Sequence, residues 1–432
     1  MNKTFRMALA SMLMVPLLPG CSGQPAGKPD QAAPEGKSIR TDPVTLTVWA
    51  SMSEEVFRKQ VVEPVQLKYP HISLKMVSTE NKMADLVASG NVPDIITDSI
   101  SSIPKYQDLS LAEDLAPYIK AYNVDLSRMD PVVLDTVRQA SGNGKLSGLP
   151  VSGNAVMLYY NKDIFDRFNA PYPKDGMTWD EIYELAKKVT RSEGGVTYRG
   201  FDFQDSFQFT ANQLSPPVVD AGTKKAVVNN EKWKKLFENY ARFYTIPGNE
   251  VNDKTYGKGL DQFVKDKTLA MYATSSIFSR SPDAVKNGLN FDVVTLPSFA
   301  EAPGTTTQVD GGLRIVSTTG ANKDQAFLAV SAMLSEDAQR YVTRNGDLTV
   351  LKEKSIMEEF GKEIEVLKDR NRLSFIKSKP AAPSPSFTKY DSSAYSIVRA
   401  QFKKMVLTQA DVNTILRETE DLVDKAIADA SK

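Results

Sequence analysis

The stretch TLTVWASMSEEVFRKQVVEPVQLKYPHISLKMV, residues 45–77, places a strand, a helix and a second strand in succession. Residues 45–49 alternate polar and apolar side chains, which is typical of a strand with one buried face. Ser53 then offers an N-cap, and the two glutamates after it suit the positive end of a helix dipole. Pro64 is expected to kink or end that helix, and residues 72–77 form the next strand. The stretch therefore predicts a β-α-β unit and places the chain in the α/β class.

The alternation of strands and helices continues outward from this unit. Residues 85–89 predict a helix that closes on Gly90, and residues 93–96 enter a third strand. Thr178 and Glu181 form a capping box at the start of a further helix. This pattern is typical of a parallel or mixed sheet that is covered by helices on both faces.

The second half of the chain adds more predicted helices. One of them carries Trp233 on its apolar face, so this side chain is expected in the core. Residues 326–334 are helical, and Ser335 caps the helix that follows. Residues 379–386 are rich in proline and predict a loop, and the last helix is expected to begin at a cap near Thr408.

A short apolar stretch at the amino terminus resembles the signal of a bacterial lipoprotein. Lys3 and Arg6 precede an apolar run over residues 7–18, which is too short to span a bilayer, and Cys21 follows it. In such signals the chain is cut before the cysteine, which then receives acyl chains such as palmitate. The resemblance implies that residues 1–20 are removed and that Cys21 carries lipid. Pro19 departs from the small or aliphatic residue that is usual at its place.

The segment after the cysteine is expected to be a flexible tether. Residues 21–40 are rich in Gly, Pro, Ala, Gln and Lys and contain one aliphatic side chain larger than alanine, Ile39. Such a segment buries too little apolar surface to fold. An ordinary secretory signal with an incidental cysteine is the alternative interpretation of the amino terminus.

Composition excludes several classes of protein. Cys21 is the only cysteine among 432 residues, so an intramolecular disulfide and a cysteine-based metal site are not expected. Removing Lys3 and Arg6 from the 53 basic residues leaves 51, which against 53 acidic residues gives a net charge of −2. No dense basic stripe interleaved with aromatic residues indicates a nucleic-acid binder. Residues 41–432 are too many for one ordinary core and predict two lobes.

Six segments together resemble the family 1 extracellular solute-binding proteins, which are the receptors of ABC importers. None of the segments is specific alone, but their order along the chain is that of the family, and they span nearly all of it after the signal. The segments are VASGNVPDI (87–95), LSLAEDLAPY (109–118), KLSGLPVSGNAVMLYYNKDIF (145–165), GMTWDE (176–181), FVKDKTLAM (263–271), and Gly311-Gly312 with the run at 326–339.

The resemblance implies an α/β, two-lobed, periplasmic-binding-protein-like (type II) fold with a ligand cleft between the lobes. Lobe 1 would consist of residues 41–152 and 308–360, and lobe 2 of residues 153–307 and 361–432. The three crossovers between the lobes are expected near residues 150–155, 307–311 and 350–361. Physical reasoning favours such a cleft independently, because open parallel sheets bind ligands beyond the carboxyl ends of their strands.

The resemblance also indicates which residues would touch a sugar, which presents ring faces to aromatic side chains and hydroxyls to polar ones. Tyr390 or Tyr395 is expected to approach from the third crossover, and Gly311 is expected chiefly to permit a tight hinge. The ligand-binding residues implied are Trp49, Ser51, Asp98, Asn154, Phe201, Phe203, Asp205, Ser276, Phe278 and Gly311. Core packing is the alternative interpretation of Trp49, and no tryptophan follows residue 271, where many members of the family carry one.

Two other functions are compatible with parts of the sequence. A surface-anchored carbohydrate-active hydrolase would need two positioned carboxylates, but the sequence contains no recognisable catalytic signature, and His71 is its only histidine. A ferric-ion receptor would use Tyr159 and Tyr160, but adjacent strand residues point to opposite faces. No metal and no cofactor are therefore expected.

The sequence predicts a lipid-anchored receptor that captures a small solute, most simply a mono- or oligosaccharide, and delivers it to membrane permeases. The ATPase and permease would be separate chains, because this one has neither a phosphate-binding loop nor a polytopic region. The receptor is expected to be a monomer without catalytic activity. It would sit on the extracytoplasmic face of the cell membrane, at the surface of a Gram-positive cell.

Overall fold

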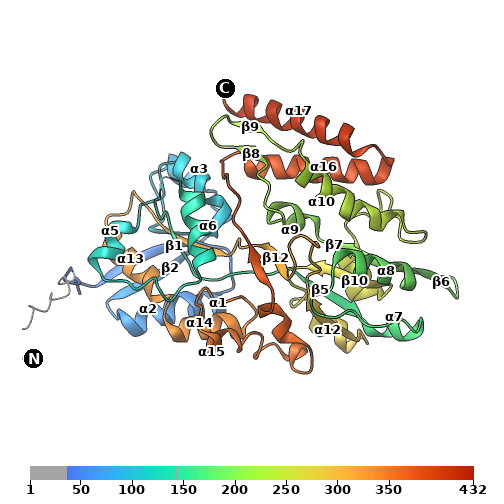
Figure 1. Ribbon diagram of the computed structural model, residues 1–432. Helices are drawn as coiled ribbons and strands as arrows, with labels where there is room; N and C mark the ends of the chain where they lie inside the picture. The colour runs from blue at the N-terminus through green and yellow to red at the C-terminus, as the bar shows by residue number, and fades with distance from the viewer. Residues whose placement is uncertain (1–36, 143) are drawn as a thin grey trace, which may run out of the picture.

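The computed structural model describes residues 37–142 and 144–432. The expected signal at residues 1–20, Cys21 and most of the expected tether lie outside the described residues. Two lobes lie side by side, and the chain passes between them several times (Figure 1). Within the described residues, no helix is both long and apolar enough to cross a membrane.

The sheet of lobe 1 has the order β2-β1-β3-β13-β4. The first three of these strands are parallel, whereas β13 runs antiparallel to both of its neighbours. Ile95 and Ile96 are both fully buried, and because neighbouring strand residues point to opposite faces, both faces of the sheet are covered. The strands are β1 (Val44–Ala50), β2 (Ile72–Ser78), β3 (Ile95–Ser99), β4 (Leu149–Pro150) and β13 (Gly312–Val316).

The helices of lobe 1 confirm most of the sequence-based starts. The Ser53 hydroxyl accepts a hydrogen bond from the Val56 amide, and Ser335 caps α14 in the same way. The helices are α1 (Glu54–Phe57), α2 (Glu63–Lys68), α3 (Met83–Ala88), α4 (Ile103–Asp108), α5 (Ala116–Ala121), α6 (Pro131–Ser141), α13 (Lys323–Ala332), α14 (Glu336–Arg344) and α15 (Lys354–Met357).

Pro64 does not end the helix, so that part of the prediction is wrong. A π-helical turn, Arg58–Val62, joins α1 to α2, and the backbone stays right-handed helical through it. Pro64 lies in the first turn of α2, where a residue without an N–H breaks no hydrogen bond within that helix. The helix therefore continues to Lys68 instead of ending at the proline.

The sheet of lobe 2 has the order β11-β5-β10-β7-β6 and is mixed. Strand β10 runs parallel to β7 and antiparallel to β5. The strands are β5 (Met157–Asn161), β6 (Arg191–Glu193), β7 (Val196–Phe203), β10 (Leu269–Thr274) and β11 (Phe291–Thr295), and a small separate hairpin joins β8 (Val219–Asp220) to β9 (Lys225–Ala226).

The helices of lobe 2 include the capping box predicted at Thr178, where the threonine hydroxyl and the Glu181 carboxylate each accept a backbone N–H. Thr408 is not the start of the last helix. It ends α16, and the side chain of Asp411 caps α17. The helices are α7 (Lys162–Arg167), α8 (Trp179–Val189), α9 (Asp205–Thr210), α10 (Glu231–Ala241), α11 (Gly259–Asp261), α12 (Ser281–Lys286), α16 (Asp391–Thr408) and α17 (Val412–Ala430).

A two-stranded ribbon lies between the lobes, and one of its strands replaces part of an expected loop. Strand β12 (Thr305–Gln308) pairs in parallel with β14 (Lys379–Ala381). Pro380 is tolerated because a two-stranded ribbon consists only of edges, where a residue without an N–H need not break a ladder. The Lys379 amide donates to the Gly304 carbonyl at 3.0 Å.

Three clusters of buried side chains show where the chain changes lobes. The cluster in lobe 1 draws on residues 46–151 and 309–356. The two clusters in lobe 2 draw on residues 155–299 and 360–427, and one of them contains Trp233. Phe360, which the sequence placed in lobe 1, packs in a lobe 2 cluster instead.

Candidate ligand-binding site at the crossovers

The carboxyl ends of the central strands in each sheet lie near the crossovers. In lobe 1 these are the ends of β1 at Ala50 and of β3 at Ser99, and in lobe 2 the ends of β7 at Phe203 and of β10 at Thr274. Open sheets bind ligands at such edges, and interlobe surfaces concentrate pockets. These edges are therefore the first place to look for a site.

The crossovers themselves are joined to one another through backbone groups. Gly153 on the first crossover exchanges two hydrogen bonds with Leu348, at 2.6 and 2.9 Å, and the Val151 amide donates to the Gly312 carbonyl at 2.8 Å. A Cβ atom on Gly311 would lie 1.9 Å from the Ser152 carbonyl oxygen, so only glycine permits this approach. Gly311 therefore makes a close backbone contact with Ser152, and its role in a hinge stays a prediction.

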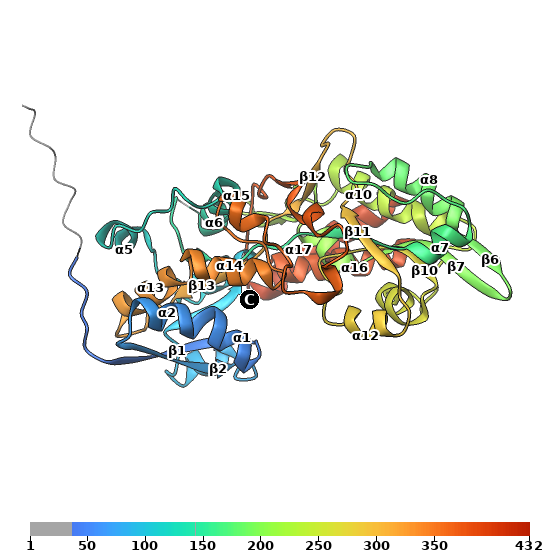
Figure 2. The same ribbon diagram turned by 90° about the horizontal axis from the view of Figure 1, so that it is seen from below.

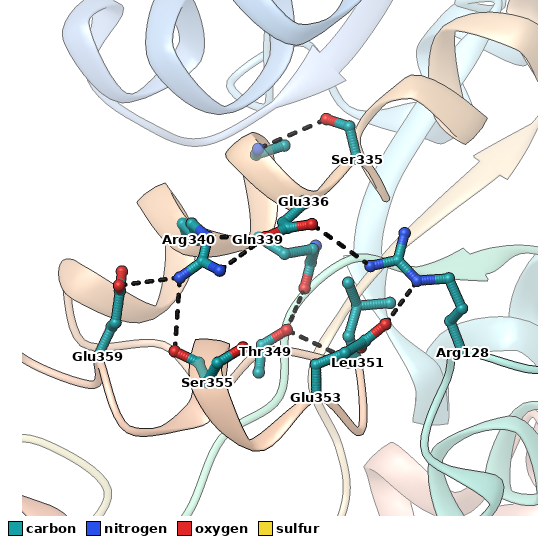
Figure 3. Close-up of polar contacts among 11 residues, drawn as sticks. Arg128, Ser335, Glu336, Gln339, Arg340, Thr349, Leu351, Glu353, Ser355 and Glu359 are labelled. Carbon is teal, nitrogen blue, oxygen red and sulfur yellow. Dashed lines mark hydrogen bonds and ion pairs between the residues drawn. The ribbon is translucent and has the colours of Figure 1, made fainter.

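Gln339 on α14 is the polar centre of this junction (Figure 3). Its amide nitrogen donates to the carbonyls of Val151 and Met333, at 2.8 and 3.1 Å. Its oxygen accepts from the Thr349 hydroxyl at 2.8 Å and the Val350 amide at 3.0 Å. The side chain is fully buried, so one residue links the first crossover, α14 and the start of the third crossover.

Ion pairs hold the third crossover against α14 from the outside (Figure 3). Arg340 bridges Glu336 and Glu359, and Arg344 also binds the Glu359 carboxylate. The Glu359 carboxylate thus lies between the two guanidinium groups. The hydrogen bond from Arg344 and the positive charges nearby hold the pKa of Glu359 below its usual range. The segment that leads into lobe 2 is thus tied to lobe 1.

Asp98 and Asp310 occupy the lobe 1 side of the junction. The Asp98 carboxylate accepts from the Tyr106 hydroxyl at 2.7 Å and from the Ser99 amide at 2.8 Å. Asp310, on the second crossover, accepts from the amide and the hydroxyl of Ser101, both at 2.9 Å. Burial raises the pKa of Asp310, the charge of Asp98 raises it further, and the hydrogen bonds from Ser101 oppose both effects.

Asn154 lies beside Asp310 and binds its backbone. The side-chain nitrogen donates to the Asp310 carbonyl at 2.9 Å, and the side-chain oxygen accepts from the Asp310 amide at 3.4 Å. Both ends of the amide are therefore used between the first and second crossovers in this conformation. Asn154 therefore binds a backbone partner that the sequence did not indicate, and its contact with a ligand stays a prediction.

Polar groups also end the strands of lobe 2. The Thr274 hydroxyl donates to the Gln204 side chain at 2.5 Å, which ties the end of β10 to the end of β7. Asp205 opens α9 and accepts from the Tyr256 hydroxyl at 3.1 Å. Burial raises the pKa of Asp205, while this hydrogen bond and the charge of Arg399 lower it.

Three aromatic residues predicted to face a ligand belong to the core, and these predictions are wrong. Trp49 is buried in the lobe 1 cluster and its indole nitrogen donates to the Asn81 carbonyl at 2.9 Å. Phe201 and Phe203 lie within β7, not in a loop, and are 0% and 4% exposed. Phe203 stacks on Tyr240 with ring centroids 4.6 Å apart, so neither phenylalanine has a free face for a sugar.

The remaining predicted residues differ in exposure. Ser51 is exposed after β1, and Ser276 is exposed after β10, where its hydroxyl accepts from the Phe278 amide at 3.1 Å. Phe278 is half-buried and packs on Phe375 with centroids 5.8 Å apart. A cavity of about 70 Å³ lies at the crossovers, lined by both lobes and including Asn154.

The sequence did not single out Asp310 and Ser101, which bind each other at the junction, or the buried Asp391 of lobe 2. Asp391 opens α16, where Thr388 donates both its amide and its hydroxyl to the carboxylate, at 3.0 and 2.6 Å. Burial raises the pKa of Asp391 to about 6. The position of Asp310 directly before Gly311-Gly312 was the available signal, because a residue beside a tight hinge lies close to both lobes.

The tyrosine residues behave differently from the predictions. Tyr395 is buried on α16 in the core of lobe 2, and the Tyr390 hydroxyl lies 3.1 Å from that of Ser431. Tyr159 and Tyr160 pack in two different buried clusters, so a ferric ion could not reach both phenols. Among the described residues, no group of three or more His, Cys, Asp or Glu side chains could hold a metal ion.

The chain has two lobes, each with a mixed sheet, and backbone hydrogen bonds join the crossovers between the lobes. This arrangement is a type II periplasmic-binding-protein fold. Residues 51–340, about two thirds of the chain, match the family of bacterial extracellular solute-binding proteins. This chain belongs to that family.

Solved structures agree on the fold. An ABC substrate-binding protein from Listeria monocytogenes in complex with cycloalternan superposes with a TM-score of 0.70 at 19% identity, covering 90% of this chain and 100% of that one. The sugar-binding protein MalE from Xanthomonas citri gives a TM-score of 0.70 at 17% identity, covering 90% and 98%.

Similarity in sequence to curated relatives covers a smaller part of the chain. The sn-glycerol-3-phosphate-binding periplasmic protein UgpB of Brucella abortus (strain 2308) is 26% identical over 217 residues, which cover 47% of this chain and 47% of UgpB. The UgpB of Agrobacterium fabrum is 27% identical over 182 residues, covering 39% of this chain and 40% of that one. The chain thus matches less than half the length of these curated relatives.

Proposed function

We propose that this chain is the solute receptor of an ABC importer and that its solute is a mono- or oligosaccharide. The observation that carries the proposal is the family match over residues 51–340, on a fold whose crossovers gather polar groups from both lobes. Two structural relatives support a sugar, because one was solved with cycloalternan and another is a sugar-binding protein.

The geometry suggests how the receptor would work. Solute would bind between the strand ends of the two lobes and favour the closed arrangement, because only closure brings both edges into contact with it. The backbone contacts among the crossovers, centred on Gly153 and Gly311, would keep the lobes in register during the motion. The closed receptor would then engage membrane permeases that are powered by a separate ATPase.

The proposal extends to the location of the protein. Cys21 would carry the lipid anchor, residues 22–40 would form the tether, and the folded lobes would work as a monomer on the extracytoplasmic face of the cell membrane. An anchor is most useful at a Gram-positive surface, where no outer membrane retains the receptor. Cys21→Ser should release the protein into the medium, as fractionation would show, while the binding of solute by the purified lobes stays unchanged.

A thermal-shift screen across sugars, polyols, phosphosugars and peptides tests the receptor itself. A solute that binds only the folded state at about 100 times its Kd should raise the free energy of unfolding by about 2.7 kcal/mol. Asp98→Ala and Asn154→Ala should weaken the binding of any solute found, without unfolding the protein. The proposal fails if no solute raises the melting temperature, and cleavage of a glycan would favour an anchored hydrolase instead.

A further inference from the structure

A cavity of about 70 Å³, which we call the crossover cavity, lies among the three crossovers. Asn154, Val309 and Leu351 line it, one from each crossover. Val133 on α6 adds a wall from lobe 1, and Ile376, shortly before β14, adds a wall from lobe 2. Both lobes and every connection between them therefore meet at this cavity.

The crossover cavity is distinct from the edges where solute is proposed to bind. None of the residues that end strands β1, β3, β7 and β10 lines it. Asn154 does line it, but both ends of its side-chain amide are bonded to the backbone of Asp310. The cavity is therefore a second compartment, and its lining decides what it can hold.

The walls of the crossover cavity are mainly apolar. Buried apolar residues of the lining include Val133, Ala155, Val309, Leu351 and Phe375. Most polar groups of the lining are already bonded within the protein, among them the hydroxyls of Thr306 and Thr349 and the Asp130 carboxylate. A buried water makes about three hydrogen bonds, so these walls favour an apolar occupant over water.

Thr343 on α14 is the exception in this lining. Its side chain is 0% exposed, and its hydroxyl has no hydrogen-bond partner among the residues that the structure describes. A buried hydroxyl without a partner lowers the stability of the fold. An occupant of the cavity with one hydrogen-bonding group would supply the missing partner.

The volume of the crossover cavity limits the size of its occupant. One water needs about 10–15 Å³ of such volume, so a cavity of about 70 Å³ holds a molecule of about five non-hydrogen atoms. A short apolar chain with one hydroxyl matches this size. It also satisfies both the apolar walls and the Thr343 hydroxyl.

We infer that the crossover cavity is a binding site for a short-chain alcohol, or a molecule of the same chemistry, with its hydroxyl on Thr343 and its carbon chain against the apolar walls. The site itself stands on the geometry of the cavity alone. Its effect on the receptor rests on the proposed function. Because the walls belong to both lobes, closure changes the shape of the cavity, so an occupied cavity shifts the affinity for solute.

Methyl NMR of the purified protein, labelled at its methionine methyl groups, tests the site with 1-butanol. Met357 lines the cavity, whereas Met271 lies on β10 in the core of lobe 2 and serves as the internal control. The Met357 signal should shift saturably and the Met271 signal should not. Cyclohexanol, which is too large for the cavity, should leave Met357 unshifted. Equal or non-saturable shifts of both signals would mean that 1-butanol acts only as a solvent, and would overturn the inference.

Thr343→Val keeps the shape of the side chain and removes the hydroxyl. The Kd of 1-butanol should rise about fivefold, which is the loss expected for one hydrogen bond. The melting temperature should not fall, because the lost hydroxyl had no partner. Thr419→Val is the matched control, since this buried helical threonine binds the Ile415 carbonyl and lies outside the cavity lining. An unchanged Kd in Thr343→Val, or an equal rise in Thr419→Val, would contradict the inference.

The effect on the receptor is measured with the sugar that gives the largest thermal shift in the screen. Saturating 1-butanol should change the Kd of that sugar about fivefold in the wild-type protein and less in Thr343→Val. Equal Kd values with and without 1-butanol would contradict the coupling. If no sugar is found, the proposed receptor function fails, and the Met357 titration still decides whether the cavity binds alcohol.

Discussion

The two lobes share an architecture but fill their cores with different side chains. The lobe 1 cluster is mainly aliphatic, with residues such as Leu46, Ile95 and Leu313 on its sheet. The main lobe 2 cluster is built on aromatic rings, among them Trp179, which meets Tyr240 edge to face with centroids 5.2 Å apart. Each sheet nevertheless ends in polar residues at the crossovers.

This difference shows that aromatic residues near a strand end do not by themselves mark a sugar site. In lobe 2 they are so numerous that the core takes up those at the end of β7, Phe201 and Phe203. Polar side chains at the same edges, such as Asp205 and Gln204, stay near the junction because burial without partners would be costly. The polar residues are the better guide to the site.

The largest effect should come from removing a ring from the aromatic core. Phe203→Ala should lower the free energy of unfolding by about 3–5 kcal/mol, because it leaves a cavity among Tyr240, Phe209 and Phe402. Guanidinium unfolding, followed by tryptophan fluorescence, measures the change. Phe327→Ala in the mainly aliphatic core of lobe 1, where the ring contacts of Phe327 are with Tyr118 and Tyr122, is the matched comparison and should cost less. A small effect of Phe203→Ala with a large loss of solute binding would reverse the assignment to the core.

The next effect concerns pH and the buried acid of lobe 2. Because burial raises the folded-state pKa of Asp391 to about 6, the folded protein holds the proton more tightly than the unfolded chain between about pH 4 and pH 6. The stabilisation of the folded state by protonated Asp391 is therefore fully present below about pH 4 and is lost as the pH rises through 6. The free energy of unfolding should fall by about 3 kcal/mol at most over this range. Asp391→Asn should flatten this slope in unfolding curves collected from pH 4 to 7. An identical slope in the variant would show that the acid is not buried as described.

Removing the polar centre of the crossovers should have a somewhat smaller effect. Gln339→Ala leaves buried groups of Val151 and Val350 without their partner, which should cost about 1–3 kcal/mol. Urea unfolding measures the loss. Gln107→Ala, which removes hydrogen bonds to Ser141 and Ser147 away from the crossovers, is the matched control. An equal loss of unfolding free energy in both variants would mean that Gln339 contributes no more to stability than a glutamine elsewhere in lobe 1.

The smallest effects are expected from removing one helix cap in each lobe. Thr178→Ala removes a full capping box from α8 in lobe 2 and should cost about 1 kcal/mol. Ser53→Ala removes a single bond of 3.3 Å from α1 in lobe 1 and should cost less. Thermal melts of the two variants decide the order, and a larger loss for Ser53→Ala would contradict it.

Local chemistry made much of the fold predictable. Alternation at residues 45–49, the caps at Ser53 and Ser335 and the box at Thr178 each depend on neighbours in sequence, and the structure confirms them. The strand at Lys379–Ala381 was missed because its partner, β12, lies more than seventy residues earlier. The ending expected at Pro64 was wrong because the proline lies in the first turn of α2, directly after a π-helical turn that no local pattern indicated.

The candidate site was less predictable than the fold. Asp98 lies within β3 and Asn154 lies between β4 and β5, and the contact of each with neighbouring groups depends on tertiary packing. Asp310 reaches Ser101 across more than two hundred residues, and no local pattern indicates that bond. Whether Trp49 packs or stacks also depends on the carbonyl of Asn81, which only the folded chain brings near.

The interleaving of the lobes has a consequence for the order in which the chain can fold. Strand β13 fills the place between β3 and β4, so the sheet of lobe 1 is incomplete until residue 316 has been synthesised. Lobe 2 waits longer still, because Phe402 and Ile415 near the carboxyl terminus complete its core. Such long-range pairing slows folding, because distant segments must meet before they stabilise each other. For most of its synthesis the polypeptide therefore has no finished lobe, a state in which an export channel can still thread it across a membrane.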